Sequence, residues 1–322
     1  MEGECFGVTV SAVCRQVGIT RQNYYARRKA RQRQQVDAGL VVALVVAERQ
    51  LQPRLGSRKL HFMLQPKLVA AGVGLGRDRF LEVLRAHELL LEPKLTEYPC
   101  TTNSQHCLPV FSNQIKDRVL SQPNEVWVSD LTYLRTEEGF MYLSLVTDKY
   151  SRKVVGYHCG DTLAAVGCIQ ALGMALKDLP AWAHPIHHSD QGSQYCCHEY
   201  VNALAVRGLT ISMTERDHCA ENALAERMNG ILKSEYGLGQ KIKTKLQARQ
   251  MVDQGVQLYN ARRPHTALDY RTPAAVHHTV DPARSCAASR LRSGSPTRLR
   301  SAAKRRNPTT TAKTTPHKNV TN

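Results

Sequence analysis

The chain has 322 residues, which is more than one typical compact domain and enough to bury a substantial core. Its 44 Lys and Arg residues against 27 Asp and Glu give a formal net charge of +17, and a surplus of this size indicates a polyanionic partner such as nucleic acid. The longest apolar run, residues 39–46, is far shorter than the roughly 20 residues that cross a bilayer, and the N-terminus lacks a signal layout, so a membrane protein is excluded and a cytoplasmic location is expected.

The basic charge is concentrated at the two ends of the chain. Residues 1–120 carry 18 basic and 10 acidic side chains, residues 121–280 carry 16 of each, and residues 281–322 carry 10 basic side chains and 1 acidic one. This division indicates a neutral middle segment that uses its carboxylates, and flanks that neutralise phosphates. The 10 cysteines include no C-x-x-C pair, so neither a zinc finger nor a dithiol redox motif is expected.

Residues 1–94 are predicted to be helical. Residues 11–35 indicate a short helix, a turn at Gly18 and a second helix, rich in Arg and Tyr, that is capped by Thr20. This pattern fits a DNA-binding helix-turn-helix, and it fits an ordinary helical hairpin with a basic face equally well. Three further helices are expected at residues 40–50, 57–72 and 76–90.

The sequence also predicts two DNA-contacting residues, a linker and a C-terminal tail. Arg58 and Lys59, beside the break before the second of these three helices, suit contact with a DNA backbone. Residues 95–122 are polar, interrupted by Pro and without period, which predicts a linker. Residues 281–322, rich in Ser, Thr, Arg and Pro, are expected to form a disordered basic tail.

Between residues 123 and 280, strand and helix signals alternate. Strands are expected at residues 125–135, 139–151, 153–160, 183–190 and 209–213, and helices at residues 162–179, 197–208 and 220–236. Three consecutive strands followed by alternating helices and strands predict an α/β fold with a mixed sheet.

Three carboxylates in this segment occupy positions that suit metal binding. Asp130 lies inside the first strand, Asp190 ends the fourth strand, and Glu226 lies one turn into the last helix. Phosphoryl transfer with two metal ions needs carboxylates that flank both ions, and Mg²⁺ prefers oxygen ligands. Lys233 shares a helical face with Glu226 two turns later, where an ammonium group can reach phosphate. For Glu226 taken alone, a solvated helix face is the simpler interpretation.

Two other groups of residues leave alternatives open. His187 and His188, just before Asp190, suit either substrate positioning or a structural role behind the site. Arg262 and Arg263 belong to the segment YNARRPH, residues 259–265, and they fit DNA contact and packing against the sheet equally well.

Six segments, in order and spacing, resemble one family. They are PNEVWVSDLTYL, YLSLVTDKYSRKVVGY, HSDQGSQY, ISMT, ENALAERMNGILKSEY and YNARRPHTALDYRTP. Together they are similar to the catalytic core of bacterial insertion-sequence transposases of the DDE, retroviral-integrase-like superfamily, specifically the second-frame (OrfB-type) protein of the two-frame elements. The resemblance extends over about residues 10–278, and the basic tail lies outside the family pattern.

The resemblance implies a ribonuclease H-like core in residues 123–280, with the first and fourth strands side by side and helices on both faces of the sheet. It places the metal-binding triad on Asp130, Asp190 and Glu226, and the family's basic residue on Lys233. It implies two Mg²⁺ ions, for which Mn²⁺ can substitute, and metal-dependent cleavage and strand transfer on double-stranded DNA at element ends and target. It also implies a homo-oligomer on DNA and an upstream-frame (OrfA-type) partner that supplies the main end-recognising helix-turn-helix.

Two other functions fit some of the same residues. One is a catalytically silent DNA-binding regulator of transposition, which a missing metal requirement would favour. The other is a ribonuclease H-like nuclease that cuts hybrids or junctions, since the acidic triad alone suits either enzyme. The ordered flanking motifs favour the transposase.

Overall fold

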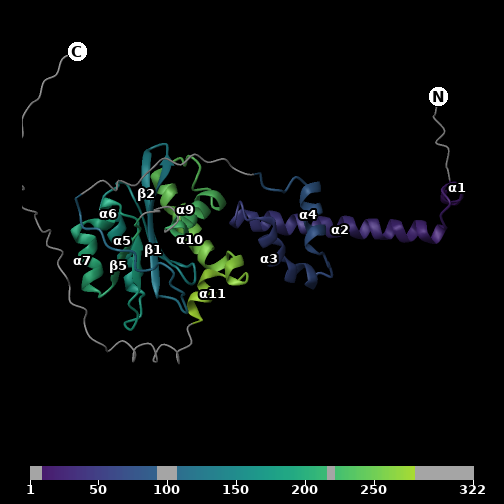
Figure 1. The fold of residues 1–322 in the computed structure, drawn as a ribbon. Helices are drawn as coiled ribbons and strands as arrows, with labels where there is room; N and C mark the ends of the chain where they lie inside the picture. Colours follow the sequence, from purple (N-terminus) through teal and green to yellow (C-terminus); the bar gives the residue numbers. More distant parts are fainter. Residues whose placement is uncertain (1–8, 93–106, 216–221, 280–322) are drawn as a thin grey trace, which may run out of the picture. The chain divides into compact units, whose positions relative to one another are not determined.

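The computed structural model describes residues 9–92, 107–215 and 222–279. Its centre is a five-stranded sheet with the strand order β3-β2-β1-β4-β5 (Figure 1). The strands are β1 (Val126–Thr136), β2 (Gly139–Asp148), β3 (Val154–Gly160), β4 (Ile186–Ser189) and β5 (Thr210–Met213). β1, β2 and β3 pair antiparallel, whereas β4 pairs parallel with both β1 and β5. The sheet is therefore mixed, as the sequence predicts.

β1 lies between β2 and β4, so the expected contact of the first and fourth strands is confirmed. In the parallel β1–β4 pair, Val128 is the partner of His188. Continuing this register by two residues on each strand brings Asp130 level with Asp190, which follows directly after β4. Parallel pairing thus places two carboxylates that are distant in sequence side by side on neighbouring strands.

Helices cover both faces of the sheet (Figure 1). On one face lie α5 (Ala165–Lys177), α6 (Ser193–Cys196) and α7 (His198–Val206); on the other lie α9 (Ala223–Glu235) and α10 (Lys245–Arg262). Alternate residues of β1 point to the two faces. Trp127 packs with Leu172 and Tyr200, whereas Leu134 packs with Met228 and Tyr259, each in its own buried cluster. This strand order with two helical layers is the expected ribonuclease H-like core.

α10 has no counterpart among the helices predicted from the sequence. Its buried face is made by Ala248, Val252, Gly255, Val256 and Tyr259. Two of these residues are small, so the apolar period of the helix is weak in the sequence. A short 3-10 helix, η1 (Thr266–Leu268), and α11 (Pro273–His278) follow it.

The N-terminal helices are α1 (Val10–Gln16), α2 (Arg21–Leu51), α3 (Ser57–Ala70) and α4 (Arg77–Ala86). The turn at Gly18, with φ +69°, and the cap at Thr20 are confirmed, since the Thr20 hydroxyl accepts a hydrogen bond from the Asn23 amide at 3.2 Å. The two helices predicted at residues 21–35 and 40–50 are one helix of 31 residues, which corrects that expectation.

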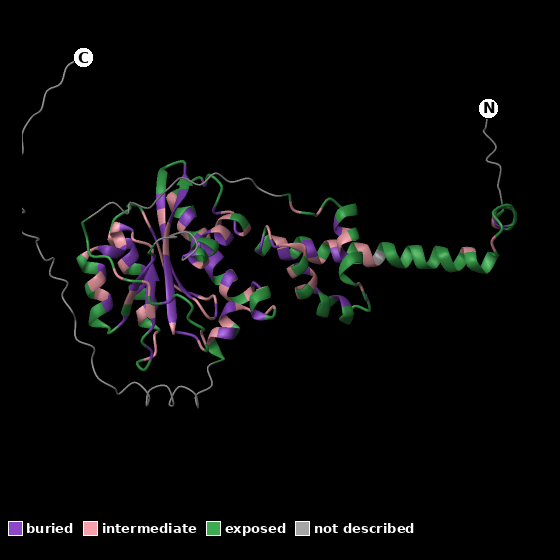
Figure 2. Ribbon diagram, viewed as in Figure 1, coloured by how far each residue is buried: buried purple, intermediate pink, exposed green. Residues whose placement is uncertain are grey.

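The continuity of α2 has a simple physical reason. Its only potential breaker is Gly39, and a single Gly inside a helix costs about 1 kcal/mol relative to Ala. The second half of the helix gains more than this by burying Val41 and Val45 against Leu60 and Phe80. The first half is largely exposed (Figure 2).

Part of the predicted linker belongs to the fold. Residues 107–122 contain neither helix nor strand, but Ile115 is buried against Val126 and Val128, and the Gln114 amide donates a hydrogen bond to the Ser212 hydroxyl at 2.8 Å. The remaining linker residues and the predicted tail, residues 281–322, lie outside the described residues. Within the described ranges, none of the helices has the length and apolar character needed to span a membrane.

Candidate active site

α9 presents one polar face to β1. Three side chains of this face donate hydrogen bonds to β1: Asn222 to the Ser129 carbonyl (3.1 Å), Asn229 to the Asp130 carboxylate (2.7 Å) and Lys233 to the Thr132 hydroxyl (2.6 Å). The contacts follow the same order along helix and strand, so the two elements run alongside each other. The polar stripe of α9 is therefore a contact face at Asn222, Asn229 and Lys233, whereas Glu226 on the same helix is exposed.

Asp130 occupies an electrostatically unfavourable position. The pKa of Asp130 is raised to about 7, chiefly by burial, next by the nearby charge of Asp190 and more weakly by Glu226, whereas the hydrogen bond from Asn229 opposes the shift. Asp190 and Glu226 are thus near enough for their charges to disfavour the ionised form of a poorly hydrated Asp130. A cation bound beside Asp130 would therefore stabilise its ionised carboxylate.

Asp190 is held by the loop that follows β4. The backbone N–H of Gly192 donates to Asp190 Oδ1 at 3.0 Å, and this contact turns the chain directly after the carboxylate. A Cβ added at Gly192 would lie 3.0 Å from Asp190 Oδ1 and 3.2 Å from Gln194 Oε1. The glycine in the segment HSDQGSQY is therefore needed because the carboxylate folds back over it.

For the DNA cleavage that the sequence resemblance implies, Gly192→Ala is expected to lower the rate by about tenfold, because a carboxylate displaced by a few tenths of an ångström from its productive position would weaken catalysis steeply. The fold should persist, since the residue lies in a loop with an ordinary backbone conformation. Cleavage kinetics and a thermal melt of the two proteins measure both effects. Gly173→Ala, on a helix where an added Cβ meets nothing within 4 Å, is the matched control. Equal cleavage by the Gly192→Ala variant and the control would contradict the claim that Gly192 is needed to position Asp190.

The two histidines before Asp190 are interior residues. His187 is fully buried, and its Nε2 lies 2.8 Å from both the Ser129 and the Tyr200 hydroxyls. Burial, with a further contribution from the neighbouring His188, lowers the pKa of His187 to about 3, so its ring is neutral. His188 Nδ1 lies 2.8 Å from the Ser212 hydroxyl. These contacts favour the structural alternative, in which the histidines tie β4 to β1, α7 and β5.

The oxygen ligands that Asp130, Asp190 and Glu226 offer are of the type that a hard divalent cation prefers. All of them belong to carboxylates, and the pKa of Asp130 is raised by burial and then by the charge of Asp190, both of which a bound cation would counteract. In the part of the chain that the structure describes, however, no three His, Cys, Asp or Glu side chains are gathered closely enough to hold an ion. A cation held by all three carboxylates would therefore require them to move closer together.

The basic residues singled out in the sequence have different surroundings. Lys233 is half-buried between Thr132 and the Tyr133 ring, with its ammonium 4.5 Å from the ring centre. Arg58 is exposed on α3. The neighbouring Lys59 makes an ion pair with Glu235 at 3.4 Å. Lys59 is therefore directed at the core, whereas Arg58 is directed at solvent.

Arg262 and Arg263 both make two hydrogen bonds to a carboxylate. The Arg262 guanidinium bonds both Glu48 oxygens at 2.8 and 2.6 Å, and the Arg263 guanidinium bonds both Glu235 oxygens at 2.7 Å. The Arg263 side chain is only 3% exposed. These contacts favour a structural role for the buried Arg263, whereas Arg262 is 39% exposed and pairs with α2 and not with the sheet. The sequence could not distinguish these cases because both carboxylates lie far away along the chain.

The sequence pattern alone assigns no role to Asn229 or to Gly192. Asn229 was visible as a member of the polar stripe, at the spacing that places it between Glu226 and Lys233. Gly192 was visible as a glycine two residues after Asp190, which is a frequent turn pattern. Each signal was present, but only the contacts identify the carboxylate that each residue holds.

The sequence matches a family described as integrase core domain over residues 121–219, and a second family of the same description over residues 207–273. An insertion element of Shigella sonnei encodes the IS600 uncharacterized 31 kDa protein, which is 33% identical over 267 residues, or 82% of this chain and 96% of that protein. The transposase InsF for insertion sequence IS3A of Escherichia coli strain K12 is 31% identical over 232 residues, or 70% of this chain and 79% of that protein.

Among solved structures, the HTLV-2 integrase catalytic core domain in complex with magnesium is similar to this chain. It has 18% sequence identity and a TM-score of 0.40, and the match covers 49% of this chain and 98% of that domain.

Proposed function

The chain belongs to the insertion-sequence transposases with an integrase core, and from this premise we propose that its core cuts DNA at the ends of an insertion element and joins these ends to target DNA. The observation that carries the proposal is the position of Asp130, Asp190 and Glu226. Two come from adjacent parallel strands and the third from the helix that lies along β1, and their charges act together on Asp130. This is the polynucleotidyl transferase chemistry of the family.

The three carboxylates would hold two divalent cations, Mg²⁺ or in its place Mn²⁺, with Asp130 shared between them. When bound, such ions lower the pKa of an attacking hydroxyl or water and stabilise the negative charge on the leaving oxygen. In cleavage, the water oxygen bonds to phosphorus as the bond from phosphorus to the 3′ oxygen breaks, which leaves a 3′-hydroxyl. In strand transfer that hydroxyl attacks a target phosphate, and the bond from this phosphorus to the 3′ oxygen of the target strand breaks, which leaves a 3′-hydroxyl on the target. No protein side chain becomes covalently linked to DNA.

The residues around the carboxylates would keep them ready for this chemistry. The Gly192 amide fixes the direction of Asp190, and the Asn229 amide holds Asp130 until its carboxylate is engaged elsewhere. Lys233 lies on the same face of α9 as Glu226, and it would supply positive charge to a nearby phosphate. Burial lowers the pKa of Lys233 to about 8, so the ammonium remains mainly charged at neutral pH.

The partners of this reaction would be double-stranded DNA at the element ends and in the target. Lys233 and the exposed Arg58 would contact it, and the Arg-rich first half of α2 adds a largely exposed basic helix. Cutting and joining two ends requires at least two protomers, so a homo-oligomer on DNA is expected. The upstream-frame (OrfA-type) protein would complete recognition of the ends.

Cleavage of a plasmid that carries the flanking DNA of the gene tests the function. With Mg²⁺, the protein should produce strand-specific nicks with 3′-hydroxyls at the terminal repeats, and Glu226→Gln should reduce this by at least about a thousandfold while DNA binding persists, because one cation ligand is lost. Retention on a DNA column and primer extension across the ends measure binding and cleavage.

The alternatives give different results in the same experiment. Equal cleavage by the protein and its Glu226→Gln variant would contradict the site. Tight DNA binding without any cleavage, even when the upstream-frame protein is added, would indicate the catalytically silent regulator. Cutting of RNA–DNA hybrids in preference to element ends would indicate the ribonuclease H-like nuclease.

A further inference from the structure

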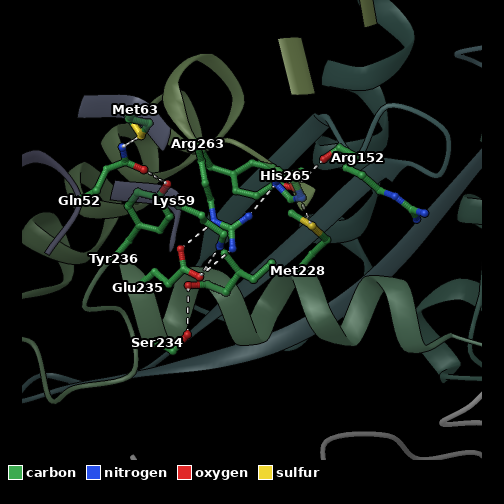
Figure 3. A network of polar contacts seen from close by, with 12 residues as sticks. Gln52, Lys59, Met63, Arg152, Met228, Ser234, Glu235, Tyr236, Arg263 and His265 are labelled. Atoms are coloured by element: carbon green, nitrogen blue, oxygen red, sulfur yellow. Dashed lines mark hydrogen bonds and ion pairs between the residues drawn. The ribbon is translucent and has the colours of Figure 1, made fainter. Parts of the chain in front are cut away.

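A cluster of three charged residues joins three parts of the chain that are far apart in sequence (Figure 3). Glu235 is the last residue of α9, and Arg263 is the C-cap of α10. Lys59 belongs to the first turn of α3. Both Glu235 oxygens accept from Arg263 at 2.7 Å, and Lys59 Nζ lies 3.4 Å from Glu235 Oε1. One carboxylate therefore binds the N-terminal helices and the end of the core at once.

Uncharged contacts surround the cluster on the same end of α9. The Tyr236 hydroxyl donates to Gln52 Oε1 at 3.1 Å, and the Arg54 amide donates to the Glu235 carbonyl at 3.2 Å. Gln52 is fully buried. The turn between α2 and α3 is thus bonded to the backbone of Glu235 and to the side chain of Tyr236, and Figure 3 shows the contact between Gln52 and Tyr236.

The two cations of the cluster share the carboxylate unequally. The Arg263 side chain is 3% exposed and makes two short bonds, whereas Lys59 is 18% exposed and makes one long one. Burial lowers the pKa of Lys59, and the attraction of Glu235 does not fully offset that effect. Loss of Lys59 would leave a matched pair of Glu235 and Arg263. The Lys59 contact can therefore be removed without leaving a buried charge unpaired.

α9 connects this cluster to the candidate active site. Lys233 is two residues before Glu235, and Glu226 is nine residues before it, about 14 Å along a straight helix. Because an α-helix is a rigid element, the position of its last turn restricts the position of its first turn. The helix α3, whose Lys59 pairs with Glu235, also carries the exposed Arg58.

We propose that Lys59 is a positioning residue, which through Glu235 docks helices α2 to α4 on the end of α9 so that DNA held by these helices meets Asp130, Asp190 and Glu226 in register. The consequence for catalysis rests on the proposed function, whereas the docking rests only on the contacts. Lys59 accordingly binds Glu235 within the protein. Of the two neighbouring residues expected from the sequence to contact DNA, only Arg58 keeps that role.

The test compares three substitutions on α3, each of which removes one positive charge. Lys59→Met should lower the cleavage rate at saturating DNA by about tenfold, as expected for a small error of register, with little change in the DNA concentration for half-maximal rate or in its salt dependence. Arg58→Met should instead weaken DNA binding and reduce the slope of log affinity against log salt by about one. Lys67→Met, the same substitution at an exposed lysine of α3, is the matched control and should leave both properties unchanged.

A second measurement does not depend on activity. Amide hydrogen exchange of Arg54, whose N–H is bonded to Glu235, and of the last turn of α9 should become about tenfold faster in Lys59→Met and stay unchanged in Lys67→Met. If the unaltered protein does not cleave, the proposed function fails and exchange still tests the docking. If it cleaves, and Lys59→Met matches Lys67→Met in rate and exchange, the docking role is overturned. A Lys59→Met variant that behaves like Arg58→Met would assign Lys59 to DNA.

Discussion

Asp130→Asn should abolish cleavage and, in the absence of divalent ions, make the protein more stable at pH 8 by about 1–3 kcal/mol. The loss of cleavage, at least about a thousandfold, follows because the shared metal ligand disappears. The gain in stability follows because burial and the charges of Asp190 and Glu226 disfavour the ionised carboxylate. An asparagine still offers an oxygen to the Asn229 amide but carries no charge.

The pH dependence has a definite sign. The pKa of Asp130 is raised from 3.8 to about 7, so the folded protein retains a proton that the unfolded chain releases. The contribution of Asp130 to stability is therefore greatest below pH 4 and decreases as the pH rises to about 7. Asp130→Asn lacks this decrease, so the two proteins should differ little at pH 4 and most at pH 8.

Urea unfolding at pH 4 and pH 8, with and without Mg²⁺, measures this prediction. Mg²⁺ should stabilise the unaltered protein at pH 8 and have little effect on Asp130→Asn. Asp178→Asn, at an exposed carboxylate after α5, is the control and should change neither stability nor cleavage. A less stable Asp130→Asn at pH 8 without metal would contradict the electrostatic account of the site.

Glu235→Gln is expected to destabilise the protein by about 3–5 kcal/mol at pH 7, because it leaves Lys59 and Arg263 as two poorly hydrated cations without a carboxylate. Burial alone would raise the pKa of Glu235, but the hydrogen bonds and charges of Arg263 and Lys59 outweigh it and lower the pKa below its ordinary value. This stabilisation is present above the ordinary carboxyl pKa and is lost as the pH falls through the lower folded value.

Urea unfolding at pH 7 and at acidic pH compares Glu235→Gln with Glu82→Gln. Glu82 pairs with Arg79 on the exposed face of α4, with side chains 56% and 53% exposed, so its loss should change stability by less than about 0.5 kcal/mol. The cost of Glu235→Gln should shrink in acid, where the unaltered protein also loses the charge. Equal effects of the two substitutions at pH 7 would show that the buried cluster contributes no more than a surface ion pair.

Several features of the fold were predictable because they depend on local pattern. The strands, the turn at Gly18, the cap at Thr20 and the polar stripe of α9 follow from residue type and spacing. The resemblance to integrase-like transposases supplied the contact of the first and fourth strands. The continuity of α2 and the helix α10 were not predictable in this way, because weak local signals were decided by the burial of a few apolar residues against partners elsewhere.

The sequence by itself determined which chemical groups the protein has. It places three carboxylates at strand and helix positions that suit metal binding, and a basic surplus outside the neutral middle segment. It also determined membership in a family that moves DNA. Only the tertiary structure decided which basic side chains face solvent and which face the core. Lys59 and Arg263 meet the same carboxylate across 176 and 28 positions of sequence. A cation binds a phosphate or a buried carboxylate by the same attraction, so its partner depends on which anion the packing brings within reach, and no local pattern contains that distance.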